Sequence, residues 1–282
     1  TASNNTAVGK SAMAANTTGS ENTAVGRGAL DANTTAEDNT SIGYNSMSAN
    51  TTAGDNTAVG ARAMEANTTG SANTTIGSRA MEANTTGVQN TAVGKDAMKA
   101  NTTGERNVAI GETALDSNTT GIRNVAIGRS ALQGTQTASY NVGVGHSAMG
   151  DTTTGHNNTA VGNGALNSTT TGNNNVGIGT QALSSSATAS GEFTLGGGDI
   201  TNLRCNDTSI SSLSDSRDKT NIVDIPLGLT FINTVRPVAF DWNRRDGSFV
   251  GKKDFGFIAQ ELKTAADATD YADHIRLVHD NN

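Results

Sequence analysis

A 17-residue repeat fills the first two-thirds of this chain. Written in rows of 17 from Asn5, the sequence aligns eleven copies without an insertion, each close to N-T-A-V-G-x-x-A-M/L-x-A-N-T-T-G-x-x. We number the positions of the repeat as columns 1 to 17. A short, fixed period is typical of a solenoid, in which each coil contacts only its neighbours and gains stability by stacking on them. The repeat therefore predicts a stack of eleven coils.

Two columns of the repeat carry the large apolar residues. Column 4 is always Val or Ile, and column 9 is always Leu or Met. Column 9 holds all six methionines, which are Met13, Met47, Met64, Met81, Met98 and Met149. Because two such residues cannot close a core within one coil, we expect both columns, represented by Val8 and Met13, to point inward.

The repeat favours strands over helices. Gly occupies column 5 in all eleven rows, and Asn-Thr-Thr-Gly or a close variant interrupts each row. Both features disfavour a continuous helix. Seventeen residues leave room for two strands of about five residues and two turns per coil. The predicted fold is thus mainly β, a parallel β-roll or β-solenoid of 17-residue coils.

Charge and side-chain size predict the surfaces of the roll. Charged residues in the array fall at only five columns, with Asp151 as the exception. Examples are Lys10, Glu21, Asp31, Arg62, Asp96 and Arg123. We expect these columns to face water and Asp151 to lie at a coil edge. A column of small residues at Ala12, Ala29 and Ala63 would let another chain approach closely, which favours a homotrimer.

Composition excludes several classes of function. The formal net charge of −7 disfavours a nucleic-acid partner, which requires a basic face. Cys205 is the only cysteine, so neither an intrachain disulfide nor a cysteine metal cluster is possible. No apolar stretch is long enough to span a membrane, so we expect no membrane insertion. Because the sequence opens with Thr1, we interpret it as part of a longer protein.

Three features of the array resemble ligand sites, and each has a simpler explanation. The Asn-Thr-Thr triplets are formal glycosylation acceptors, but we interpret them as turns capped by their own side chains. The Thr at column 14, present in every row, is similar to the hydroxyl ladder of ice-binding solenoids, but Thr is also a common strand residue. His146 and His156 are interpreted as surface residues and not as metal ligands. We expect no cofactor and no metal.

Residues 5–191 resemble known fibre repeats. The N-T-A-V-G core is similar to that of the head repeats of trimeric autotransporter adhesins and to repeats of phage tail fibres. The resemblance implies a left-handed parallel β-roll with three chains side by side. It does not identify a ligand.

The composition changes after the array. Periodicity fades near residue 183, and a stretch rich in Ser, Thr and Gly runs to about residue 212. Beyond it come Pro226, Pro237, Trp242 and five of the six phenylalanines, a composition typical of a small α+β domain. We divide the chain into a repeat domain (1–191), a neck (192–213) and a C-terminal domain (214–282).

Two motifs in the C-terminal domain resemble those of one family. The first is the run Ser214-Asp215-Ser216-Arg217-Asp218-Lys219. The second is Gly256-Phe257-Ile258-Ala259-Gln260-Glu261-Leu262. Together, in this order, they resemble the intramolecular chaperone domain of endosialidases and other tail spikes. That family's chaperone assists trimerisation of the upstream fibre and then cuts itself off, and the resemblance makes Ser214 the nucleophile and Lys219 its base.

The chemistry of this pair is reasonable. A Ser hydroxyl is a weak nucleophile until a neighbour takes its proton, and a Lys does so when desolvation lowers its pKa. The six residues alone are also compatible with a polar turn that caps a helix through Asp215 or Ser216. The second motif favours the catalytic interpretation. The family usually continues into a helical tail, which this sequence lacks, so cleavage by these 282 residues stays an open question.

The sequence therefore predicts a trimeric fibre protein of a phage tail, located in the virion or outside the cell. Its partners would be two further copies and a host cell-surface receptor, with a glycan as one candidate. Any enzymatic activity would be a single self-cleavage. The alternative is a bacterial trimeric surface adhesin, which needs a coiled-coil stalk and a membrane anchor that we do not recognise here. An ice-binding or glycan-cleaving solenoid ranks third, because cleavage needs paired carboxylates in a cleft.

Overall fold

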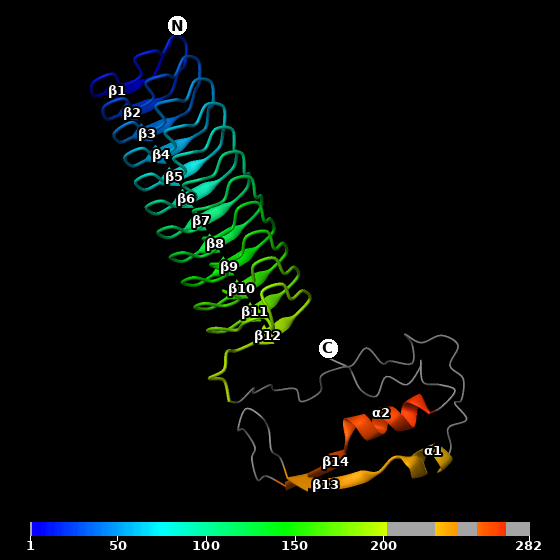
Figure 1. Ribbon diagram of the computed structural model, residues 1–282. Helices are drawn as coiled ribbons and strands as arrows, with labels where there is room; N and C mark the ends of the chain where they lie inside the picture. The colour runs from blue at the N-terminus through cyan, green and yellow to red at the C-terminus, as the bar shows by residue number, and fades with distance from the viewer. Residues whose placement is uncertain (1, 202–228, 242–252, 269–282) are drawn as a thin grey trace. The chain divides into compact units, whose positions relative to one another are not determined.

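The computed structural model describes residues 2–201, 229–241 and 253–268 (Figure 1). The chain forms two compact units, residues 1–204 and 205–282. The first unit is a parallel β-solenoid of 17-residue coils, as the repeat predicts.

The first unit holds one twelve-stranded parallel sheet, with the strands in sequence order. The strands are β1 (Thr6–Val8), β2 (Thr23–Val25), β3 (Thr40–Ile42), β4 (Thr57–Val59), β5 (Thr74–Ile76), β6 (Thr91–Val93), β7 (Val108–Ile110), β8 (Val125–Ile127), β9 (Val142–Val144), β10 (Thr159–Val161), β11 (Val176–Ile178) and β12 (Phe193–Leu195). Each residue pairs with the one 17 positions further on, as in Val8 with Val25. β12 pairs with β11, so the sheet runs one strand beyond residue 191.

Each coil contains one strand of three residues, at columns 2 to 4, where we expect two strands of five. The second predicted strand is absent from the described coils because residues at columns 7 and 9 adopt left-handed backbone angles, for example Ser11 (φ 59°) and Met13 (φ 53°). Such angles interrupt an extended chain. The turns still bond from coil to coil, since the Met13 amide donates to the Ala29 carbonyl at 3.0 Å.

Column 5 requires glycine. At Gly94 φ is 136°, and a Cβ placed there would lie 2.5 Å from the carbonyl oxygen of Gly111 in the next coil. Any side chain would therefore collide with the neighbouring backbone. Glycine at this column lets successive coils approach one another directly after the strand.

The core contains column 9, as predicted, but not column 4. Met47 and Met98 are fully buried, whereas Ile42 and Ile76 of column 4 are 38% and 44% exposed. Column 3 lies inside instead, because neighbouring residues of a strand point to opposite faces. The column 4 residues form a Val/Ile stripe on the outer face of the sheet. The stripe comprises Val8, Val25, Ile42, Val59, Ile76, Val93, Ile110, Ile127, Val144, Val161 and Ile178.

Residue size explains which column enters the core. The inner side of the strand faces the large residue of column 9, and a Cβ added at Gly177 would lie 2.7 Å from Leu166 Cγ. The interior therefore accepts one large column, and column 3 is restricted to small residues such as Ala92 and Ala160, both fully buried. A Val or Ile on this side would overpack the coil.

The small-residue column is also inside the coil, contrary to our expectation that it receives another chain. Ala29 and Ala63 are fully buried and pack in the core of their own coil, and Ala12 in the first coil is partly buried. The left-handed angle at column 9 breaks the alternation of the chain, so columns 8 and 9 both point inward.

Two columns of asparagine form hydrogen-bonded ladders inside the roll. In column 1, the backbone amide and Nδ2 of Asn39 both donate to Asn22 Oδ1, at 3.0 and 3.1 Å. The same Nδ2 donates to the Ala53 carbonyl and ties together the two ends of one coil. In column 12, Asn84 Nδ2 donates to Asn67 Oδ1 at 2.8 Å.

The column 12 ladder changes where Thr135 replaces Asn. Asn118 Oδ1 and Thr135 Oγ1 are buried and have no hydrogen-bond partner among the described residues. An unpaired buried polar atom costs about 1–3 kcal/mol. The junction between these two coils is therefore less well bonded than those before it.

The charged columns face water as predicted, with one exception. Lys10, Glu21, Arg62 and Arg123 are exposed, and so is Asp151. Asp31 is partly exposed. Our expectation is wrong for Asp96, which is only 8% exposed.

Asp96 is buried because a cation from the preceding coil covers it. The guanidinium of Arg79 lies 2.9 Å from both carboxylate oxygens of Asp96. Arg79 Nη2 donates a hydrogen bond to Asp96 Oδ2, so a charged partner replaces part of the water that this carboxylate loses on burial. Asp96 Oδ1 lies close to the same cation but has no hydrogen-bond partner among the described residues.

The second unit contains four described elements. These are helix α1 (Leu229–Thr234), strand β13 (Pro237–Asp241), strand β14 (Lys253–Phe257) and helix α2 (Ala259–Asp267). β13 and β14 form an antiparallel pair. This α+β content agrees with the predicted C-terminal domain.

Neighbouring residues in β6 provide a test of which column is inside. Ala92→Asp places a charge in the dry core, and we expect it to cost several kcal/mol of unfolding free energy. The solenoid of residues 1–204, called the shaft below, should therefore melt at a lower temperature. Val93→Asp lies on the partly exposed outer face, and we expect the single chain to keep its β-structure. Circular dichroism during thermal unfolding measures both. Equal destabilisation by the two variants would contradict the orientation described here.

Candidate functional site

The second predicted motif lies where β14 leads into α2. Gly256 and Phe257 are the last two residues of β14, and Ala259, Gln260 and Glu261 form the first turn of α2. The Leu262 amide donates to the Ile258 carbonyl at 3.0 Å, which starts the helix directly after the strand. Glu261 in the first turn places a negative charge near the positive end of the helix dipole, which favours a helix start here.

The strand pair aligns the motif with β13. Phe257 pairs with Pro237, and Gly256 pairs with Val238. A Cβ at Gly256 would lie 3.7 Å from the Phe240 ring, an ordinary contact. The described fold therefore does not itself require glycine at this position of the motif.

The motif presents apolar side chains to the outside of the single chain. Phe257 is 54% exposed and Ile258 is 39% exposed. Phe255, in the same strand, is 84% exposed. Exposed aromatic residues this close together are typical of a surface that another chain covers.

A salt bridge links the motif to β13. Arg236 Nε donates to Glu261 Oε2 at 3.0 Å, and Arg236 Nη2 donates to Glu261 Oε1. The hydrogen bonds from Arg236 lower the pKa of Glu261, and those to Glu261 raise the pKa of Arg236. Because Arg236 directly precedes β13, this pair fixes the start of α2 to the start of that strand. Sequence reasoning did not find Arg236, which stands 25 residues from its partner.

The first predicted motif lies outside the described residues. This holds for the proposed nucleophile Ser214 and base Lys219, and for Asp215 and Arg217 between them. Their catalytic roles stay predictions from the resemblance.

The comparison with family models finds one family that matches the C-terminal region. Residues 214–272 match the family described as chaperone of endosialidase. The matched range begins at Ser214 and includes both motifs, and we refer to it below as the chaperone segment. No curated protein and no solved structure matches the chain. A chaperone segment of this family following a β-solenoid fits a phage tail-fibre-like protein.

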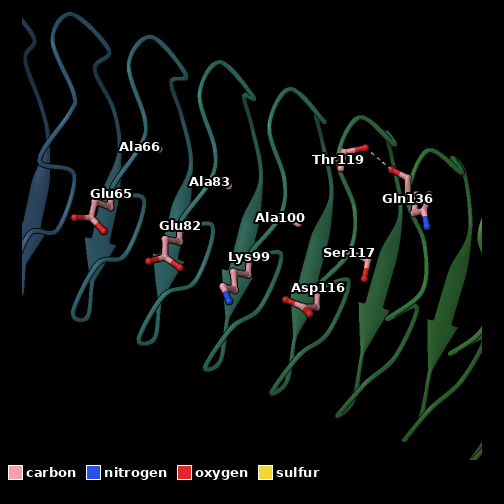
Figure 2. Close-up of a pocket in the computed structure, with 10 residues that line it drawn as sticks. All are labelled: Glu65, Ala66, Glu82, Ala83, Lys99, Ala100, Asp116, Ser117, Thr119 and Gln136. Atoms are coloured by element: carbon pink, nitrogen blue, oxygen red, sulfur yellow. Dashed lines mark hydrogen bonds between the residues drawn. The ribbon is translucent and has the colours of Figure 1, made fainter.

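The shaft has a groove that sequence reasoning missed. It has a volume of about 750 Å³ and runs along column 10, where Glu65, Glu82, Lys99 and Asp116 occupy successive coils (Figure 2). Small residues of column 11, such as Ala83, also line the groove. The signal available in the sequence was the recurrence of charged residues in column 10, at Asp31, Glu65, Glu82, Lys99 and Asp116.

The acids of this groove have nearby cations. Glu65 and Glu82 each lie 3.7 Å from the Arg62 guanidinium. Burial raises the pKa of Asp116, while the charge of Lys99 in the preceding coil opposes that shift. Since the ion pairs of Glu65 and Glu82 are long and partly exposed, we expect them to contribute little to stability, and we assign the column no catalytic role.

The asparagines of the Asn-Thr-Thr triplets are structural, as predicted. Asn67 and Asn84 are fully buried, and each Nδ2 donates both to the preceding coil and to a backbone carbonyl. A glycosyl transfer to these nitrogens would require the coil to open. The column 14 threonines are exposed in all eleven rows but lie outside the strands, so strand propensity does not explain them. Ice binding by that column is untested.

Both histidines are on the surface, as predicted. His146 and His156 are exposed, and His156 Nδ1 accepts a hydrogen bond from the Ser139 amide at 3.0 Å. In residues 2–201, 229–241 and 253–268, His, Cys, Asp and Glu side chains do not gather in groups of three or more that would suit a metal ion. Among the helices described, neither is long and apolar enough to cross a bilayer.

The salt bridge between Arg236 and Glu261 makes a pH-dependent contribution to the stability of the chaperone segment, and this contribution can be measured. We expect Glu261→Gln to lower the melting temperature of the chaperone segment by at most about a few degrees at neutral pH, because the charged pair joins two elements but is exposed to solvent. Differential scanning calorimetry of the full chain measures this transition.

The difference between wild type and variant should depend on pH in a defined direction. Since the folded-state pKa of Glu261 lies below its ordinary value of 4.5, the contribution is complete above that value and disappears as the pH falls through the lower folded-state pKa. Asp267→Asn is the control, because Asp267 pairs within α2, with Lys263 at 3.2 Å, and with no other element in the described part of the chain. A melting difference that stays constant down to strongly acidic pH would contradict this assignment.

Proposed function

We propose that this chain is the shaft of a trimeric phage tail fibre that attaches to the host, and that its C-terminal chaperone promotes trimerisation and then cleaves itself. The observation that carries the proposal is the match of residues 214–272 to the chaperone of endosialidase family, directly after a β-solenoid. A solenoid with an exposed apolar stripe is prone to associate wrongly while it folds, and a dedicated chaperone is useful for such a chain.

The outer face of the sheet supports trimerisation. The Val/Ile stripe is apolar in all eleven coils. Apart from Val8 in the first coil, six of its residues between Ile42 and Ile178 are more than a third exposed. An uninterrupted apolar stripe of this length is unusual on a monomer and suits an interface between chains. The stripe replaces the alanine column as the surface on which our trimer prediction rests.

Charges limit the stripe on both sides. Column 6, two residues after the stripe, carries Lys10, Arg27 and Arg129, and column 17 carries Glu21 and Arg123. All five are exposed. Because charged side chains remain in water, the contact between chains would be confined to the strands, with three stripes meeting along a common axis.

The exposed aromatic residues of the chaperone segment support the same arrangement. Phe255 and Phe257 lie in β14 with 84% and 54% of their surface exposed. Packing three chaperone segments would cover these rings and would remove water from nearby groups. We infer that cleavage depends on this step.

The self-cleavage would use the Ser-Lys pair. Lys219 takes the proton of the Ser214 hydroxyl, the oxygen attacks the carbonyl carbon of the scissile peptide bond, and the proton passes to the departing amine. Water then hydrolyses the resulting ester. A solvated lysine is protonated at neutral pH and cannot act as the base, whereas burial favours its neutral form. Assembly therefore switches the cut on.

Mutations in the Ser-Lys pair should abolish cleavage without abolishing assembly. In the full gene product, we expect Ser214→Ala and Lys219→Ala each to leave an uncleaved chain that still forms trimers, since chaperoning rests on packing and cleavage on the pair. Mass spectrometry of the intact chains and sedimentation measure the two properties. Cleavage of either variant at the wild-type rate would show that the pair is wrongly assigned. Failure of both variants to assemble would show that folding and cleavage are not separable.

The stripe should be required for association but not for the coil. We expect Ile110→Asp to weaken the trimer at least tenfold in sedimentation equilibrium while circular dichroism retains the β signal, because Ile110 is 39% exposed on the outer face. Thr120→Asp, at an exposed position of column 14 in the same row, is the matched control and should leave the trimer intact. A stable wild-type monomer at micromolar concentration would refute trimerisation through this face.

A further inference from the structure

Tyr140 lies at an exposed position of the shaft that the proposed assembly does not use. Its side chain belongs to column 17, and 46% of the residue is exposed. Column 17 also carries charged residues in five of the eleven rows, namely Glu21, Asp38, Asp55, Arg106 and Arg123. Because these charges stay in water, Tyr140 remains accessible when the Val/Ile stripe is covered.

Arg123 holds the tyrosine ring in place from the preceding coil. Its guanidinium carbon lies 5.4 Å from the ring centroid, and Arg123 Nη1 donates to the Tyr140 hydroxyl at 3.0 Å. The cation–π contact and the hydrogen bond to the hydroxyl together restrict the orientation of the ring. Since Arg123 contacts the ring near its hydroxyl from the preceding coil, the side of the ring toward the coil of Asn157 is the one left for a ligand.

The side chains of column 17 become short directly after this ring. Asn157 and Asn174 occupy the next two coils, and Gly191 follows. Both asparagines are exposed. The tyrosine therefore forms a wall, and the two asparagines form the floor of a ledge one or two coils wide.

The neighbouring column 16 supplies fixed polar groups. His156 Nδ1 accepts the Ser139 amide at 3.0 Å, and Asn173 Oδ1 accepts the His156 amide at 2.7 Å. A neutral imidazole whose Nδ1 is an acceptor carries its proton on Nε2. Within the described shaft, no hydrogen bond uses His156 Nε2 or Asn173 Nδ2. Both N–H groups are therefore donors held by the backbone and available to a ligand.

An apolar ring face beside fixed amide and imidazole donors has the chemistry that recognises a sugar. One face of a pyranose presents C–H groups that pack on an aromatic ring, and its hydroxyls accept and donate hydrogen bonds at the edge. We propose that Tyr140, Asn157, Asn174, His156 and Asn173 form a glycan-binding ledge. This inference rests on the proposed function in host attachment and names the ligand class and the place on the shaft.

Tyr44 is a matched control within the same chain. Its ring is also exposed, at 43%, and the Arg27 guanidinium carbon of the preceding coil lies 5.7 Å from the ring centroid. Ala61 and Ser78 stand in the two following coils, where the Tyr140 ledge has asparagines. Tyr44 therefore has the same stacked ring without the amide floor.

The test compares two binding assays on fluorescently labelled trimers of the full chain. One assay uses an array of neutral and acidic oligosaccharides from bacterial surfaces, and the other uses intact cells of a panel of bacterial strains. We expect wild type and Tyr44→Ala to bind the same oligosaccharides, and Tyr140→Ala to bind them at least tenfold more weakly. Tyr140→Phe keeps the ring face and should retain most of the binding. Circular dichroism checks that each variant is folded.

The remaining outcomes separate this inference from the proposed function. Unchanged oligosaccharide binding by Tyr140→Ala overturns the ledge. Wild-type binding to cells without binding to any oligosaccharide on the array overturns the glycan ligand and leaves host attachment standing. Absence of binding to every strain tested counts against host attachment itself, and with it against the ledge.

Discussion

The asparagine ladder of column 1 is the interaction on which the shaft depends. A coil of 17 residues with one three-residue strand has little backbone pairing of its own, so each coil needs another means of closing and of binding its neighbours. The amide of Asn39 does both, because its Nδ2 reaches a carbonyl at the far end of its own coil and also the Oδ1 of Asn22. Buried amides that bond to each other in this way fix the register between neighbouring coils. A slip by one residue would leave the donors and acceptors of the whole column unpaired.

The sequence was sufficient to predict the solenoid, the 17-residue coil and the buried methionine column, because all three follow from the period and from the position of one apolar column. It was not sufficient to place column 4. Hydrophobicity argues that Ile76 is inside, but the interior at the strand is already occupied by column 9, and only a side chain as small as that of Ala92 fits beside it. The left-handed residues of columns 7 and 9, such as Arg62 and Met64, also carry no local signal of the kind that glycine gives. The volume inside the coil and the backbone angles of columns 7 and 9 therefore determine which columns are buried, and hydropathy alone does not.

The chaperone segment was predicted differently, from two short motifs in a fixed order. This reasoning located the β14–α2 junction but not Arg236, because a salt bridge between residues far apart in sequence leaves no local pattern. The shaft and the chaperone segment share one physical property, since each presents apolar surface that a single chain leaves uncovered. In the shaft this surface is the Val/Ile stripe, and in the chaperone segment it is formed by Phe255 and Phe257. The association of copies that we propose would cover both surfaces.

The replacement of asparagine by threonine at position 135 has a consequence for how the shaft comes apart. In a linear stack, stability is approximately the sum of the intrinsic terms of the coils and the coupling of each adjacent pair. Among the described residues, Asn118 Oδ1 and Thr135 Oγ1 have no hydrogen-bond partner, so we expect the coupling at this junction to be weaker than at the junctions with a complete ladder. The shaft then behaves as two blocks, residues 5–123 and 124–191, joined at a seam. Strain or heat would separate the blocks at the seam before either block unravels, and amide hydrogens on its two sides would exchange in two groups with different rates.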